Sequence, residues 1–186
     1  MATLIGRFRE RHPGVQVQVL EPDSADGVSA LVRDGACELG AAHLPVAGKQ
    51  LIAHPLSEQE LLFILPPHAV PEGSGRLGPR ELARTPLVVS PPGTSTRMLL
   101  EQSLATVGVT PQVAVQTAAR EAIIPLVLAG AGAALLPAPL AREAQRRGAA
   151  VRGARPAITR MVGLIHRQGP LSPAARAFLA LSTEGA

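Results

Sequence analysis

The sequence of 186 residues has no tryptophan, no tyrosine, only three phenylalanines, one lysine and one cysteine. Because Cys37 is the single cysteine, no disulfide can form within the chain, and we expect its side chain to be buried core rather than a redox sensor. The scarcity of aromatic rings removes the platforms on which nucleic-acid bases stack. The arginines are scattered, so the net charge of +4 does not predict a nucleic-acid surface. No apolar run approaches the roughly 18 residues of a membrane span.

Apolar residues make up 46% of the chain, which indicates a globular protein rather than a disordered one. The length is sufficient for a substantial core and allows either one domain or two small lobes.

One stretch combines the signals of a strand, a loop and the start of a helix. Residues 87–90 are mostly apolar and β-branched, prolines and a glycine follow at 91–93, hydroxyl residues occupy 94–96, and helical apolar spacing begins at Met98. A helix N-terminus leaves about four backbone N–H groups without helical partners and carries roughly half a positive charge, so this loop suits an anion such as a carboxylate. The alternative is that one of the hydroxyl residues only caps the helix.

A pattern of strand, helix and strand occurs twice in the sequence. Apolar and polar residues alternate in 15–19, which predicts a half-buried strand, and they alternate again in 111–116. Pro13 precedes the first stretch and Pro111 begins the second, and these two prolines are 98 positions apart. A helical pattern ending in glycine follows each stretch, with Gly35 and Gly132 separated by 97 positions, and a short apolar strand comes next. The repetition predicts two similar α/β lobes.

The second repeat has a leading strand at 87–90, whereas Met1 already lies within a helical pattern. We therefore expect the first lobe to be N-terminally truncated, with a strand and its loop preceding Met1 in the native protein. The alternative is that the first sheet is simply smaller.

Two long apolar runs, 60–67 and 161–166, predict buried strands, and Ser172 with Pro173 predicts the start of a terminal helix. If that helix packs on the first lobe, the two strands cross between the lobes, and the cleft between lobes is a place for a small ligand. The expected domain organisation is lobe I at 1–65 and 163–186, and lobe II at 66–162.

Several motifs distributed over nearly the whole chain occur in a specific order and spacing. They are FRERHPGV at 8–15, VRDGACELGA at 32–41, HPL at 54–56, ELA at 81–83, PLVV at 86–89, TSTR at 94–97, LVLAGAGAALLP at 126–137 and LSPAARAF at 171–178. Together these motifs resemble the effector-binding domain of LysR-type transcriptional regulators. Glu38 replaces the family's usual aspartate and Gly40 its usual alanine.

The resemblance implies the type 2 periplasmic-binding-protein fold, with two Rossmann-like lobes joined by two crossover strands. It also implies a bacterial cytoplasmic regulator that binds a small effector, often an anion, and assembles as a dimer or tetramer. In that family promoter DNA is bound by an N-terminal winged helix-turn-helix, which is absent from these residues. We expect no membrane partner, no cofactor, no metal and no catalysis.

The resemblance also assigns candidate site residues. Effector contacts are expected at Gly93, Thr94, Ser95, Thr96, His43, Thr117 and Gly132. A subunit interface is expected at Leu4, Phe8, Arg11, Leu100 and Leu104. Alternatives exist for several positions: His43 as a hydrogen-bonded structural histidine, Thr117 as a helix cap, Gly132 as a helix terminator, and Arg97 as an ion-pair partner of Glu101 four residues on.

Two other functions remain open. A secreted solute-binding protein of a transporter would share the fold. An enzyme such as a prephenate dehydratase is weakly suggested by the Thr96-Arg97 pair, but the five scattered histidines, the lack of metal-ligand spacing and the lack of a paired nucleophile and base argue against catalysis.

Overall fold

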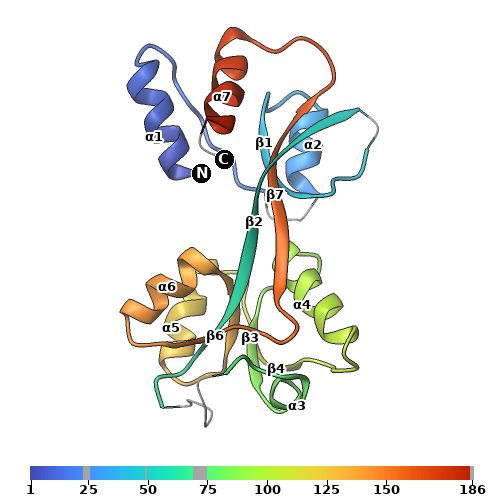
Figure 1. Cartoon of the computed structure of the whole chain (residues 1–186), viewed down its shortest axis with the longest axis vertical. Coiled ribbons are helices and arrows are strands. Elements are labelled where there is room, and N and C mark those ends of the chain that lie inside the picture. Colours follow the sequence, from blue (N-terminus) through green and yellow to red (C-terminus); the bar gives the residue numbers. More distant parts are fainter. Residues whose placement is uncertain (23–25, 49, 69–74, 185–186) are drawn as a thin grey trace. The chain divides into compact units, whose positions relative to one another are not determined.

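Two long strands run through both halves of the molecule (Figure 1). The computed structural model describes residues 1–22, 26–48, 50–68 and 75–184. The chain forms two compact units: unit 1 comprises Met1–Glu58 with Met161–Ala186, and unit 2 comprises Gln59–Arg160. The boundaries fall inside β2 (Leu51–Leu65) and β7 (Ile158–Arg167), so both strands contribute to both units. The expected pair of crossing strands is confirmed, and the chain divides within these strands rather than after Leu65 and Val162.

The described part of unit 2 contains most of the strands and four α-helices. Its elements are α3 (Pro79–Leu82), β3 (Pro86–Val89), α4 (Ser95–Ala105), β4 (Gln112–Gln116), the 3-10 helix η1 (Arg120–Ala122), α5 (Ile123–Leu128), β5 (Ala134–Pro137), α6 (Ala138–Arg146) and β6 (Ala150–Arg152). Strand β3 pairs in parallel with β4, and Leu87 forms a parallel bridge with Ala133, just before β5. Strands β5 and β6 both pair antiparallel with the end of β2.

Strands β3, β5 and the end of β2 are continuously apolar because both faces of the sheet are covered there. Successive side chains of β2 alternate between two clusters: Phe63 belongs to one and Ile64 to the other. Helix α4 closes the first cluster with Leu100 and Leu104. Helices α5 and α6 contribute to the second cluster. Pro125 is tolerated because it is the third residue of α5, where its missing N–H has no helical acceptor to lose.

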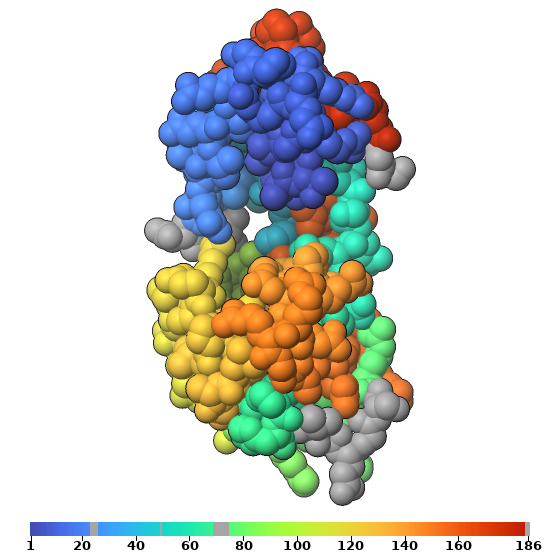
Figure 2. All heavy atoms as spheres, turned by 90° about the vertical axis from the view of Figure 1, so that its left-hand side faces the viewer, coloured from blue at the N-terminus to red at the C-terminus, as the bar shows by residue number. Residues whose placement is uncertain are grey.

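Unit 1 is built from α1 (Ala2–Arg11), α2 (Gly27–Arg33), β1 (Gly40–Leu44), the shared strands, and α7 (Pro173–Thr183). Strand β1 pairs antiparallel with β7. Helices α1 and α7 pack together, with the rings of Phe8 and Phe178 5.1 Å apart. Ser172 caps α7 by accepting a hydrogen bond from the Ala175 N–H at 3.1 Å, as the sequence predicts. The face of unit 1 turned to the viewer in Figure 2 is formed largely by the blue N-terminal segments.

The strand predicted for residues 15–19 does not form. Among the described residues no neighbouring chain pairs with this segment as a ladder, and an unpaired strand is not stable in water. Arg9 instead donates to the carbonyl oxygens of Pro13, at 2.8 Å, and of Val15. Val19 is 69% exposed, so the alternation did not mark a half-buried strand here.

In the described part of the chain, no helix has the length and apolar character needed to cross a membrane.

Candidate functional site

The carboxyl ends of β3 and β4 meet at one edge of the unit 2 sheet. Val89 pairs with Gln116, the last residue of β4, and the N–H of Thr117 donates to the carbonyl oxygen of Val89 at 3.0 Å. The chain leaves β3 at this edge and enters the loop that leads to α4. Because the strands are parallel, Thr117 and the loop lie at the same edge, which is where open α/β sheets bind ligands.

Helix α4 begins without a side-chain cap. Thr94 occupies the N-cap position, but its hydroxyl donates to the carbonyl oxygen of Pro91 at 2.9 Å and does not accept from the helix. The conventional capping role that the sequence left open is therefore not observed. Gly93 adopts φ +84°, a left-handed conformation that favours glycine, and turns the chain into the helix. The first N–H groups of α4, from Ser95 onward, have no side-chain cap in the described structure, so they remain able to bind an anion.

Arg97 lies in the first turn of α4 and is mostly buried. Its Nε donates to Glu101 Oε1 at 2.5 Å, so the predicted ion pair at this spacing is confirmed. The Arg97 side chain is only 10% exposed, however, so this is not an ordinary surface ion pair. Its Nη1 is buried and has no hydrogen-bond partner in the described structure. A cation with a spare donor therefore lies in the first turn of the helix whose N-terminus is uncapped.

The remaining predicted effector contacts do not all gather at this edge. Thr117 Oγ1 accepts a hydrogen bond from the Ala119 N–H at 3.1 Å, so this residue also shapes its own turn. Gly132 lies beside Pro86, at the opposite end of β3: a Cβ on Gly132 would be 2.6 Å from the Pro86 carbonyl oxygen. Close packing against the Pro86 backbone, rather than proximity to the α4 loop, explains why residue 132 is a glycine. His43 belongs to unit 1, where it lies in β1 opposite Val162 of β7.

Most of the predicted interface side chains serve the units' own cores. Phe8, Leu100 and Leu104 are buried within their units, because each helix turns its apolar stripe toward its own unit. Leu4 is partly buried, and Arg11 forms an ion pair with Glu184 at 2.6 Å within the chain. Met98 is an exposed large hydrophobic side chain on α4.

Two polar pairs were missed by the sequence interpretation. Arg160 donates to Gln59 across β7 and β2, and His166 contacts His54 between the same strands. The partners are 101 and 112 positions apart, so no local pattern could have identified either pair.

The arrangement of parallel strands, an uncapped helix N-terminus and two crossing strands can be compared with known proteins. The family model described as the LysR substrate binding domain matches residues 1–186. The chain belongs to this LysR substrate-binding domain family. Its type 2 periplasmic-binding-like fold is thereby established, in agreement with the resemblance drawn from the sequence.

Curated relatives and solved structures resemble this LysR domain over most of its length. A phosphonates import ATP-binding protein, PhnC, from Anaeromyxobacter dehalogenans (strain 2CP-C) is 31% identical, over 96% of this chain and 37% of its own length. A probable hydrogen peroxide-inducible genes activator from Mycobacterium avium is 28% identical, over 90% of this chain and 54% of its own length. The regulatory domain of CcmR from Synechocystis PCC6803, solved in complex with 2-PG, has a TM-score of 0.88 at 18% identity, over 98% of this chain and 89% of that one.

The chain therefore spans about a third to a half of the curated relatives that it matches. Within the described ranges, no group of three or more His, Cys, Asp or Glu side chains is placed to hold a metal ion.

Proposed function

We propose that this LysR domain senses a small anionic effector and transmits its binding to DNA-binding heads in a full-length transcription factor. The observation that carries the proposal is the uncapped N-terminus of α4, at the carboxyl edge of β3 and β4, with the partly unpartnered Arg97 in its first turn. A carboxylate at this edge would accept backbone N–H groups and gain from the positive end of the helix dipole. The hydroxyls of Ser95 and Thr96, and Thr117 on the neighbouring turn, would fix its orientation.

The proposed sensing mechanism uses both units. An effector held by the α4 loop of unit 2 and by His43 of unit 1 would favour the arrangement of units that allows both contacts. It shifts the equilibrium only by the difference between its affinities for the two arrangements. Within a cytoplasmic dimer or tetramer, this shift would change the angle between attached DNA-binding heads. The relative from M. avium is named an activator of genes, which supports a regulatory role.

A thermal-shift screen tests the anion site. The wild-type chain, a Thr94→Ala/Ser95→Ala variant and a Thr106→Ala control are heated with small carboxylates, sugars and amino acids. Thr106 lies at the opposite end of α4, where its hydroxyl donates to the Ser103 carbonyl oxygen at 2.7 Å. A ligand at about 100 times its dissociation constant adds roughly 2.7 kcal/mol, which raises the midpoint by about 5 to 10 °C in a protein of this size.

We expect carboxylates to raise the midpoint of the wild type and the control but not of the double variant. An equal shift in all three proteins would move the binding site away from the α4 loop. A response to sugars alone would contradict the anionic class of effector. Small-angle scattering with and without the responding compound then tests whether binding changes the arrangement of the units.

A further inference from the structure

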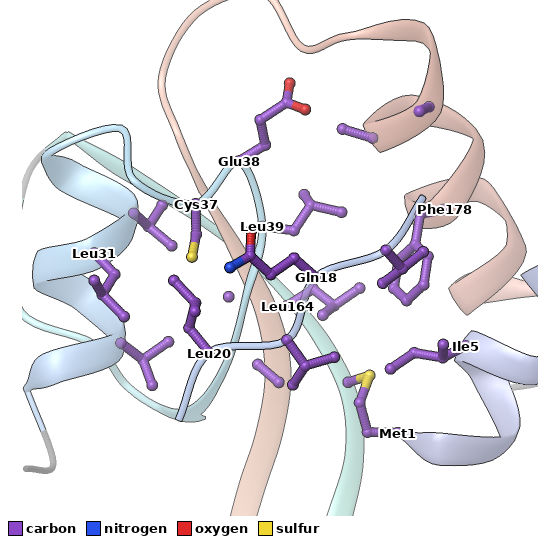
Figure 3. Close-up of a pocket in the computed structure, with 18 of the residues that line it drawn as sticks. Met1, Ile5, Gln18, Leu20, Leu31, Cys37, Glu38, Leu39, Leu164 and Phe178 are labelled. Atoms are coloured by element: carbon purple, nitrogen blue, oxygen red, sulfur yellow. The ribbon is translucent and has the colours of Figure 1, made fainter. Parts of the chain in front are cut away.

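The groove in unit 1 is a poor place for a negatively charged ligand (Figure 3). It has a volume of about 420 Å³ and mostly apolar walls, which include Ile5, Leu31 and Phe178. Among the described residues that line it, the one charged side chain is Glu38, which accepts hydrogen bonds from the N–H and the hydroxyl of Ser172. An anion in this groove would therefore meet a like charge and no arginine or lysine.

The carboxyl edge of the unit 2 sheet offers positive charge instead. Strand β5 follows a parallel bridge to β3, so the carboxyl ends of both strands lie at this edge. Strand β2 runs antiparallel to β5, with Leu61 opposite Pro137, so Gln59 lies two residues beyond the end of β5. Leu61 and Phe63 belong to the core cluster that α4 closes. Because alternate residues of a strand share a face, Gln59 lies on the α4 face of the sheet, at the edge where α4 begins.

Two arginines occupy this face at the same edge. Ile158 of β7 belongs to the cluster under α4, and Arg160 follows it by two positions on the same side of the strand. The guanidinium of Arg160 donates to the Gln59 side chain from Nε at 2.9 Å and from Nη2 at 2.8 Å. Arg97 lies in the first turn of α4, three residues before the buried Leu100 and on the same stripe.

Both guanidiniums keep a buried nitrogen without an acceptor. The Nη1 atoms of Arg97 and Arg160 are buried, and neither has a hydrogen-bond partner in the part of the chain that the structure describes. Arg97 has Glu101 as its counter-charge, whereas Arg160 forms no ion pair with any described carboxylate. A buried cation whose acceptor is a neutral amide is costly unless an anion completes its surroundings.

The neighbouring charges do not compensate Arg160. Glu60 of β2 forms an ion pair with Arg76 instead, at 3.0 Å. Residues 86–96 and 111–119, which supply the loops at this edge, contain no Asp, Glu, Lys, Arg or His. The charge of Arg160 is therefore left for a ligand to match.

We propose that Arg160 binds a second negatively charged group of the effector, while Arg97 and the N-terminus of α4 bind the first. The effector of this domain is then a molecule with two anionic groups, such as a dicarboxylate, rather than a monocarboxylate. This inference rests on the anion site proposed for the α4 loop. It adds Arg160 as a binding residue that determines specificity.

Gln59→Glu tests the assignment without removing the arginine. The new carboxylate has nearly the shape of the amide and supplies an anion to Arg160 from within the chain. We expect the Tm to rise, because the buried cation gains a counter-charge, and the second anionic group of a ligand to lose its place. Gln145→Glu is the matched control, because it makes the same change at an exposed position of α6.

The probes are the dicarboxylates from malonate to adipate and the monocarboxylates of the same chain length. Isothermal titration calorimetry at constant ionic strength measures their dissociation constants. We expect the wild type and Gln145→Glu to bind at least one dicarboxylate about tenfold more tightly than its monocarboxylate, as a charged hydrogen bond provides. In Gln59→Glu this preference should fall to about twofold or less, with monocarboxylate binding unchanged.

The outcomes separate this inference from the α4 anion site. Equal binding of dicarboxylates and monocarboxylates by the wild type would overturn the role of Arg160 and leave the α4 site in place. A dicarboxylate preference that persists in Gln59→Glu, or a Tm that this substitution fails to raise, would overturn it as well. If none of the probes binds the wild type, the α4 anion site itself is contradicted, and the role of Arg160 with it.

Discussion

The side-chain oxygen of Gln59 accepts two hydrogen bonds from Arg160, from Nε at 2.9 Å and from Nη2 at 2.8 Å. Gln59 is the first residue of unit 2 on β2, and Arg160 is the last on β7. Burial lowers the pKa of Arg160 to about 10, so the guanidinium remains charged at neutral pH. Its Nη1 is buried without a partner in the described structure. A single neutral amide therefore holds a desolvated cation where both strands pass from one unit to the other.

Replacing only one member of this pair should be worse than replacing both. Gln59→Leu leaves the buried guanidinium without its acceptor and should lower the free energy of unfolding by about 2 kcal/mol. Gln59→Leu/Arg160→Met removes both polar groups and should be close to the wild type. Urea denaturation followed by circular dichroism measures the difference, since the chain lacks tryptophan and tyrosine fluorescence. A double variant at least as unstable as Gln59→Leu would show that the charge is not the cause.

The pair formed by His54 and His166 gives a second prediction. His166 Nδ1 lies 2.8 Å from the carbonyl oxygen of Arg167, which can only accept, so Nδ1 carries the proton. In the neutral ring Nε2 of His166 then accepts from His54 Nε2, 3.0 Å away. His54→Phe keeps an aromatic ring but leaves the buried Nε2 unsatisfied, and should cost about 1 to 3 kcal/mol.

His54→Phe/His166→Phe serves as the control for that hydrogen bond. Replacing both partners by apolar rings should restore most of the lost stability, because the rings stack with centroids 5.1 Å apart. The imidazole nitrogen resonances of the wild type report the protonated nitrogen directly. A spectrum that places the His166 proton on Nε2 would contradict the assignment.

Substitutions at a core position and at a surface position of α4 should change the stability by different amounts. Leu104→Ala creates a cavity in the core of unit 2 and should cost about 2 to 5 kcal/mol without changing the oligomeric state directly. Met98 is 42% exposed, so Met98→Glu should change stability by less than about 0.5 kcal/mol. Sedimentation of Met98→Glu then tests whether this face of α4 contacts a second subunit. An unchanged assembly would remove α4 from the proposed interface.

Substitution of Gly132 tests whether this residue serves backbone packing or contacts the effector. Its φ is +142°, and a Cβ at this position would lie 2.6 Å from the Pro86 oxygen, so Gly132→Ala should destabilise unit 2 by about 2 kcal/mol. Gly6→Ala is the matched control, because Gly6 lies in α1 with open space around it and should gain about 0.5 to 1 kcal/mol. Retained stability in Gly132→Ala, together with weakened effector binding, would instead favour a ligand role.

The sequence was sufficient to predict the buried end of β2, because covered sheets require continuous apolar runs such as residues 61–65. It did not predict strand β6 at Ala150–Arg152. It was also sufficient for the start of α7 at Ser172, where the cap and the proline are local signals. The strand at 15–19 was predicted wrongly because pairing depends on a neighbour that no local pattern reveals.

The directions of the side chains at the site were harder to predict from the sequence. An apolar stripe such as Phe8 or Leu104 identifies the buried face of a helix but not whether its own sheet or another subunit covers it. The hydroxyl of Thr94 could cap α4 or turn back to Pro91, and only the geometry of the loop decides between the two. The contact between Gly132 and Pro86 joins residues far apart in sequence and was likewise invisible.

The passage of β2 and β7 through both units has a consequence for how the molecule melts. If one unit unfolds, its parts of β2 and β7 lose their fixed positions. The hydrogen-bond ladders of these strands then fray where they enter the other unit. The units are therefore distinct in packing but thermodynamically linked, and we expect heat to unfold them in one cooperative transition.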